Sequence, residues 1–192
     1  DGSQYKPIGN GNGIDACDLT LDPNTAHTLL SLSDGNRKVR CVKGRQLYPD
    51  HPDRFDCCKQ VLSAESLTGR HYWEVEWGGI SGTVAISYGR IQRKGDSEDC
   101  WFGYNNHSWT LNCCDKIFSV WHNNKKTAIP VHPSDFHRVG VYLDWTAGTL
   151  SFYLISPDTH TLTHLHTFKT CFTEPLYAGF WIDKDSFVSL CV

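Results

Sequence analysis

The 192-residue sequence has no methionine, no Cys-x-x-Cys pair and no internal repeat at the period of a solenoid or propeller. None of its apolar runs approaches the roughly 18 residues of a membrane-spanning helix, and no signal-peptide pattern opens the chain. Its 18 basic and 21 acidic residues are intermixed and give a net charge of -3, so the basic stripe typical of nucleic-acid binding is missing. We therefore expect no transmembrane segment and no nucleic-acid partner. Without an initiator methionine, we also expect a piece of a longer protein.

Nine cysteines are present, an odd number. In the adjacent pairs Cys57-Cys58 and Cys113-Cys114, neighbouring side chains of a strand would point to opposite faces, so neither pair could hold one metal ion. A domain of this length can bury its own core without disulfides, and cysteine often behaves as a small buried hydrophobe. The sequence thus predicts mostly free thiols, no metal site and no cofactor, and it leaves the compartment open.

The stretch around Trp73 organises the rest of the chain. It is opened by Thr68-Gly69, closed by Gly78-Gly79, and alternates between two faces. One face is aromatic or β-branched and the other is polar: His71, Trp73, Val75 and Trp77 against Tyr72, Glu74 and Glu76. This alternation is typical of a half-buried antiparallel strand, and its large aromatic face needs an opposing sheet to cover it.

Similar alternating stretches recur along the chain, separated by turn signals such as Asp34-Gly35-Asn36. Only residues 24–27 suggest a short helical turn, and the Gly- and Asn-rich residues 1–13 read as a linker. The fold class predicted is all-β, an antiparallel two-sheet β-sandwich. The expected strands are 17–23, 29–33, 38–42, 60–63, 69–77, 82–88, 109–113, 117–122, 125–129, 138–144, 149–155, 160–168, 176–181 and 187–191.

Three of these stretches together resemble the PRY-SPRY (B30.2) family. They are Leu21-Asp22-Pro23, Trp73-Glu74-Val75-Glu76 and Leu143-Asp144-Trp145-Thr146, the last with Trp and Thr where the family commonly has Tyr and Glu. The resemblance covers residues 14–192, with a PRY part at about 14–66 and a SPRY part at about 67–192. It implies a bent, concanavalin-like sandwich that binds protein epitopes through loops at one edge, without catalysis.

Three further segments, 48–55, 121–124 and 159–168, look like fish members of this family. Such members form the C-terminal domain of two kinds of protein, and the resemblance does not choose between these two parent proteins. The first is a secreted stonefish-type pore-forming, cytolytic (haemolytic) toxin subunit, in which the domain would contact a protein or cell-surface target and possibly a second subunit of a heterodimer. The alternative is a cytoplasmic tripartite-motif ubiquitin ligase or nucleotide-binding leucine-rich-repeat immune protein, in which it would recognise a pathogen or host protein.

The resemblance also places the ligand-binding edge. The residues it implies come from a charged loop, one strand and a late turn: Arg93, Lys94 and Asp96; Asn112 and Cys114; Phe180, Trp181 and Asp183. Trp181 precedes a polar loop and is expected at the surface as an aromatic anchor, a common feature of binding hot spots. The other six tryptophans are expected to pack in the core.

Four other features suggest chemistry but have plainer explanations. A catalytic cysteine–histidine pair needs an activated thiol, and no cysteine lies in a nucleophile motif. His160, His164 and His166 share one face of an expected strand, and His164 and His166 could flank a metal ion, but the three fit a solvated strand face. Glu74 and Glu76 fit surface ion pairing better than acid–base catalysis. Asn106-His107-Ser108 is a glycosylation sequon, so Asn106 is a possible modification site if the protein is exported. We therefore predict no catalytic residues.

Overall fold

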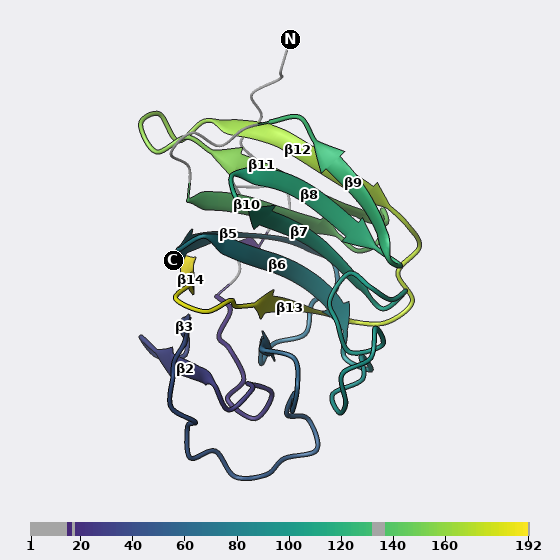
Figure 1. Cartoon of the computed structure of the whole chain (residues 1–192). Coiled ribbons are helices and arrows are strands. Elements are labelled where there is room, and N and C mark those ends of the chain that lie inside the picture. Colours follow the sequence, from purple (N-terminus) through teal and green to yellow (C-terminus); the bar gives the residue numbers. More distant parts are fainter. Residues whose placement is uncertain (1–14, 17, 132–136, 192) are drawn as a thin grey trace.

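Two stacked antiparallel sheets form the molecule in a computed structural model that describes residues 15–16, 18–131 and 137–191 (Figure 1). The eight-stranded sheet has the order β12-β11-β10-β5-β14-β3-β2, with β1 paired in parallel to β5, and the six-stranded sheet has the order β4-β13-β6-β7-β8-β9. No described residue lies in a helix. The first sheet contains β1 (Asp15–Ala16), β2 (Leu30–Ser33), β3 (Lys38–Cys41), β5 (Arg70–Gly78), β10 (Arg138–Asp144), β11 (Thr149–Ile155), β12 (Leu162–Lys169) and β14 (Phe187–Cys191). The second contains β4 (Gln60–Leu62), β6 (Ser81–Tyr88), β7 (Ser108–Cys114), β8 (Ile117–His122), β9 (Lys125–Ile129) and β13 (Leu176–Trp181).

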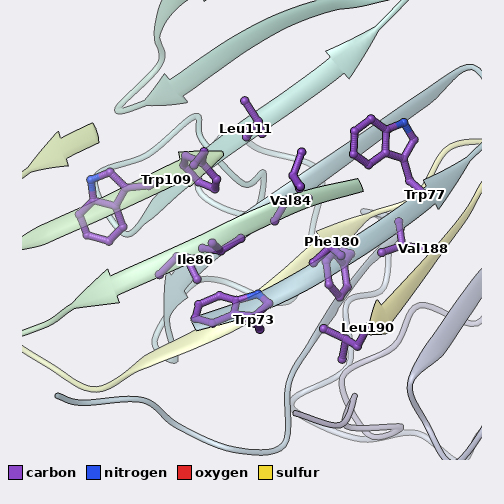
Figure 2. Packing of buried hydrophobic residues seen from close by; sticks show 14 of the residues in the cluster. Trp73, Trp77, Val84, Ile86, Trp109, Leu111, Phe180, Val188 and Leu190 are labelled. Atoms are coloured by element: carbon purple, nitrogen blue, oxygen red, sulfur yellow. The ribbon is translucent and has the colours of Figure 1, made fainter. Parts of the chain in front are cut away.

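The core lies between the two sheets, and β5 contributes its centre as the sequence predicts. Trp73 and Trp77 retain only 3% and 5% of their exposure, and Val75 is fully buried. Figure 2 shows these tryptophans among side chains of the opposing sheet such as Val84 and Phe180. An aromatic side chain buries roughly 150–250 Å², so the two tryptophans of β5 are a large part of the contact between the sheets. The predicted all-β sandwich is confirmed.

The hairpins follow the turn chemistry of the sequence. The predicted β2–β3 hairpin forms, with Asp34, Gly35 and Asn36 at φ 51°, 62° and 64°. Two tighter turns join β7 to β8 and β8 to β9, each through two residues in the left-handed region: Asp115-Lys116 and Asn123-Asn124. Two left-handed residues in succession define the turn whose twist matches that of paired strands. These turns fix the register of β7, β8 and β9.

Three local expectations were wrong. Residues 18–23 do not form a strand, because Leu21 and Asp22 donate their N–H groups to two different segments and only an isolated bridge to Ser63 results. The expected helical turn at 24–27 is a simple turn closed by the Thr25 N–H on the Asp22 carbonyl. All of β6 is buried rather than half of it, and on its outer face Ala85 packs in one cluster with Ile91 and Phe102 of the following loop. The predicted linker, 1–13, lies outside the described residues.

All eight cysteines in the described part of the chain are free thiols, as the sequence predicts; Cys17 lies outside it. Cys58, Cys100 and Cys113 are buried. Burial raises the pKa of Cys58 to about 12 and that of Cys113 to about 11, because a thiolate is poorly solvated there. These two thiols are therefore packing groups rather than nucleophiles.

Candidate functional site on the outer face of the six-stranded sheet

The outer face of the six-stranded sheet carries a polar floor. In β7, Trp109 and Leu111 point into the core, so Thr110 and Asn112 point outward. The register places Thr83 of β6 opposite Asn112, and Trp181 of β13 opposite Thr83. None of the three side chains Thr83, Thr110 and Asn112 makes a hydrogen bond to another described residue. Thr83 and Thr110 are only 6% and 1% exposed, so the half-buried Asn112 amide is the accessible polar group of this floor.

Aromatic side chains surround this polar floor. The loop between β6 and β7 brings Trp101 to Trp181, with ring centroids 6.4 Å apart, and stacks Tyr104 on Trp121 at 5.1 Å. The pocket between them is open to solvent on one side and has a volume of about 110 Å³. No charged residue lines it; its lining consists of Gln60, Thr83, Trp101, Phe102, Tyr104, Thr110, Asn112, Trp121 and Trp181. We call this cavity the aromatic pocket. Its size suits one inserted side chain or another small uncharged group.

Buried polar side chains fix the loop that carries Trp101. The Gln60 amide donates to the Cys100 carbonyl at 2.7 Å and accepts from the Phe102 N–H at 2.9 Å, and Gln60 is fully buried. The Asn105 amide donates to the carbonyls of Glu98 and Trp101, both at 2.9 Å. These contacts are all made within the chain and hold the pocket wall in place, and a fixed wall lowers the entropy cost of binding.

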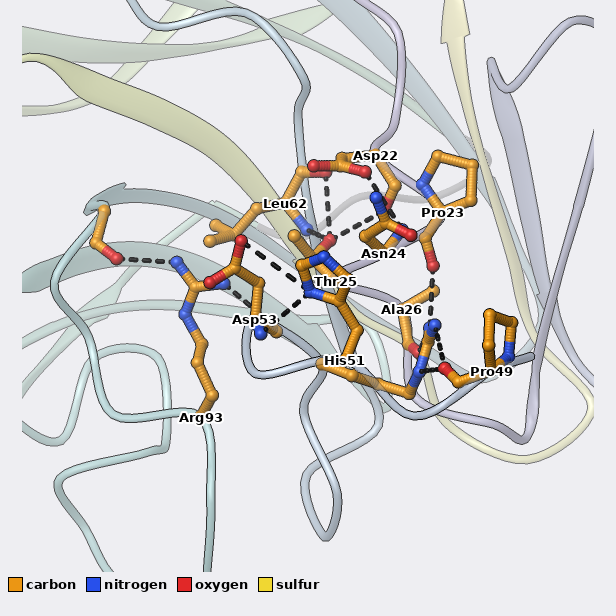
Figure 3. Close-up of polar contacts among 12 residues, drawn as sticks. Asp22, Pro23, Asn24, Thr25, Ala26, Pro49, His51, Asp53, Leu62 and Arg93 are labelled. Carbon is orange, nitrogen blue, oxygen red and sulfur yellow. Dashed lines mark hydrogen bonds and ion pairs between the residues drawn. The ribbon is translucent and has the colours of Figure 1, made fainter.

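The three predicted residues of the charged loop support this wall but do not line the pocket. The Arg93 guanidinium donates to the carbonyls of Asp53 at 2.7 Å and Gly89 at 2.6 Å, and part of this network is visible in Figure 3. Lys94 Nζ donates to the carbonyls of His51 and Arg54. Asp96 accepts from the indole N–H of Trp101 at 3.2 Å. Arg93 and Lys94 therefore join this loop to the loop around residues 51–54, whereas Asp96 fixes Trp101 within the same loop.

The remaining predicted residues are divided between pocket, rim and core. Asn112 and Trp181 line the pocket. The Asp183 carboxylate accepts from the Ser81 hydroxyl at 3.1 Å, and Cys114 is exposed at the end of β7, in register with Ser81. Phe180 is fully buried, because it precedes Trp181 on a strand and so points to the opposite face. Phe180 has no surface to offer a ligand, and we remove it from the candidate site.

Sequence reasoning missed Trp101 and Trp121, which were assigned to the core. A signal for Trp121 was present: in β8 it shares a face with the polar Ser119, whereas Phe118 and Val120 on the other face are apolar and pack in the core. No such signal exists for Trp101, since it lies in a loop. Trp145 is also only partly buried, and its indole N–H donates to the Glu174 carbonyl at 2.8 Å.

The alternative chemistries find little support in the geometry. Among the described residues, no three His, Cys, Asp or Glu side chains are grouped as a metal site. His164 bonds to the Thr167 hydroxyl instead. Arg138 lies 3.5 Å from Glu74 and 4.0 Å from Glu76, so these carboxylates form ion pairs as predicted. Asn106 is exposed, and its glycosylation stays a prediction. A search of the described residues finds no helix of the length and hydropathy that crossing a membrane requires.

Comparison with known proteins agrees with this fold. The chain matches the model of the SPRY-associated domain PRY over residues 19–67 and that of the SPRY domain over 70–191. It is 45% identical to stonustoxin subunit beta of Synanceia horrida over 86% of this chain and 23% of that protein. It is 41% identical to tripartite motif-containing protein 16 of Mus musculus over 88% of this chain and 30% of that protein.

The chain thus spans about a quarter of the length of these relatives. Among solved structures, the TRIM65 PSpry domain superposes with a TM-score of 0.80 at 29% identity, covering 94% of this chain and 92% of that one. The SPRY model alone matches well over half of the chain. The sequence motifs, the two-sheet sandwich and these matches agree, and the chain belongs to the PRY-SPRY family.

Proposed function

We propose that this chain is a non-catalytic recognition module that binds a protein or cell-surface determinant in the aromatic pocket. SPRY domains are in general binding modules. The observation that carries the proposal is the uncharged pocket itself, in which three tryptophans surround a floor of unused hydroxyl and amide groups. Tryptophan is among the residues most enriched at interface hot spots, which cluster in well-packed pockets. Arg93, Lys94 and Asp96 act in this proposal by holding the wall, while Asn112 and Trp181 contact the ligand.

For the parent protein, we propose a secreted cytolytic toxin subunit of the stonefish type. The support is the similarity to stonustoxin subunit beta and to stonustoxin subunit alpha, each matched over about the same part of this chain. Those names describe subunits, so a second subunit is a partner that this proposal includes. The module would then bring the parent protein to its target cell.

The second candidate is the recognition domain of a cytoplasmic tripartite-motif or related immune protein. The match to tripartite motif-containing protein 16 covers as much of the chain as the toxin match does. The eight free thiols of the described residues favour this candidate, because cytosolic proteins keep their cysteines reduced.

The test is binding of the fluorescently labelled domain to intact fish erythrocytes, with the unlabelled domain as competitor. Replacing Trp181 with Ala should weaken saturable binding by roughly 30-fold or more, the effect of losing about 2 kcal/mol at a hot spot. Leu47→Ala is the control, because Leu47 is fully exposed and outside the pocket. Equal binding by both variants would reject the pocket as the site. Absence of surface binding, together with Trp181-dependent capture of one discrete protein from cytosol, would select the immune candidate.

A further inference from the structure

The two sheets present four edge strands, and three of them are blocked to further pairing. Strand β2 has four residues, and its Leu30 carbonyl already accepts from the Tyr48 hydroxyl. Strand β4 has three residues, and Asp22 and His27 donate to its outer carbonyls. Strand β12 contains a register shift that leaves Leu165 without a partner in β11. Bulges and short edge strands are devices that prevent pairing with another chain.

Strand β9, the fourth edge, is longer than β2 and β4, has no bulge, and none of the described residues donates to its outward carbonyls; its only protection is the charge of its lysines. It pairs with β8 over five consecutive residues without a register shift, and no described strand pairs with its other side. Lys125, Lys126, Thr127 and Ala128 are all exposed. The turn before β9 is held in place, because Asn123 and Asn124 donate their N–H groups to the carbonyls of Asn105 and Gly103, each at 3.0 Å. The edge is therefore regular, accessible and fixed at one end.

The turn determines which backbone groups face outward. In a hairpin closed by two left-handed residues, the two residues on either side of the turn bond to each other through their backbone groups. Along the strands, hydrogen-bonded pairs then alternate with pairs that are not hydrogen-bonded to each other. Here the flanking pair is His122 and Lys125. The backbone groups of Lys126 and Ala128 consequently face away from β8, and each offers one N–H and one C=O to an incoming strand.

Charge decides which strand such an edge accepts. Adjacent residues of a strand point to opposite faces, so Lys125 and Lys126 place one cation on each side of β9. Neither lysine forms an ion pair with a described acid; Lys126 Nζ lies 5.7 Å from the centroid of the Trp121 ring. The nearby Glu98 carboxylate accepts from the Asn124 amide at 3.2 Å. A second copy of β9 would be repelled by like charges, whereas an acidic strand would be attracted.

We propose that the outer edge of β9 is a docking site for an extended acidic segment of a partner protein, which adds to the six-stranded sheet as a further strand. The main-chain groups of Lys126 and Ala128 provide the pairing, and the two lysines select the charge. Strand addition of this kind takes affinity from backbone hydrogen bonds and specificity from side chains on both faces. The site adjoins the aromatic pocket through Trp121 but does not include its floor.

The test uses the folded domain and four end-capped peptides. Two have the sequences Glu-Glu-Thr-Val-Thr-Val-Thr and Thr-Val-Thr-Val-Thr-Glu-Glu, which allow either strand direction, and two carry Lys-Lys in place of Glu-Glu. Binding is measured by the amide NMR shifts of β9 at low and at high salt. We expect one acidic peptide to bind at least tenfold more tightly than its basic counterpart, with shifts confined to β8 and β9 and affinity falling as salt rises.

Two variants separate the backbone from the charges. Ala128→Pro removes one outward N–H and should abolish binding, while its control, Ala128→Ser, keeps that N–H and should bind normally; the melting temperatures of both verify the fold. The double change Lys125→Glu and Lys126→Glu should reverse the preference toward the basic peptides. The proposal is overturned if no acidic peptide binds, if acidic and basic peptides bind equally, or if a folded Ala128→Pro variant binds normally.

Discussion

Replacing Gln60 with Leu tests whether one buried amide holds the pocket wall. The change keeps the volume but removes the donor to the Cys100 carbonyl and the acceptor for the Phe102 N–H. Each buried group left without a partner costs about 1–3 kcal/mol, or about 4 kcal/mol for the two at mid-range. Burying an apolar side chain recovers up to about 2 kcal/mol. We therefore expect the free energy of unfolding to fall by about 2 kcal/mol.

Urea unfolding followed by far-UV circular dichroism measures this loss. With an m-value of about 2 kcal/mol/M, the midpoint should move down by about 1 M. Amide hydrogen exchange gives the local readout: the Phe102 N–H should lose protection by more than the global destabilisation explains. The matched control is Gln92→Leu, because the Gln92 amide is exposed and makes one hydrogen bond, to the Lys94 carbonyl. That variant should change stability by less than about 0.5 kcal/mol.

The reasoning fails if the Gln60 variant is as stable as the Gln92 control. It also fails if stability falls but Phe102 exchanges no faster than the global change requires, since the amide would then support the fold without holding the loop. A third check is ligand binding. If the erythrocyte binding predicted for the pocket survives Gln60→Leu unchanged, the position of Trp101 does not depend on this contact.

Three further changes have definite expected results. Gly148→Ala should lower stability by at least about 2 kcal/mol in thermal melts, because Gly148 has φ 73° and a Cβ there would overlap the Thr170 carbonyl; a normal melt would contradict this. Burial lowers the pKa of His122, so the unfolded chain binds its proton more readily and stability should fall as the pH drops below about 6.5. His122→Gln should reduce that fall, measured by urea titrations at several pH values. In native protein at pH 8, a thiol reagent should leave Cys58 unmodified and react first with the exposed thiols, identified by mass spectrometry: Cys57, Cys114 and Cys171.

The sequence predicted those features that depend on neighbours along the chain. The alternation around Trp73 gave a buried strand face, and Asp34-Gly35-Asn36 gave a hairpin. The family resemblance, and not a local pattern, implied Asn112 and Trp181 as binding residues, and both line the aromatic pocket. The direction of Trp101 could not be predicted, because it depends on Gln60, some 40 residues away in the chain. For the same reason the charges of Arg93 and Lys94 seemed available, although carbonyls of a distant loop occupy them.

The contact between Gln60 and the pocket wall also shows how two segments of the chain depend on each other. Gln60 belongs to the segment that matches the PRY model, whereas Cys100 and Phe102 belong to the SPRY match. The first segment supplies β2 and β3 to one sheet and β4 to the other, so both sheets are incomplete without it. If the two segments were separated, each would keep unpaired strands and an uncovered apolar face. The two segments of this chain are therefore parts of one sandwich, although two separate models describe their sequences.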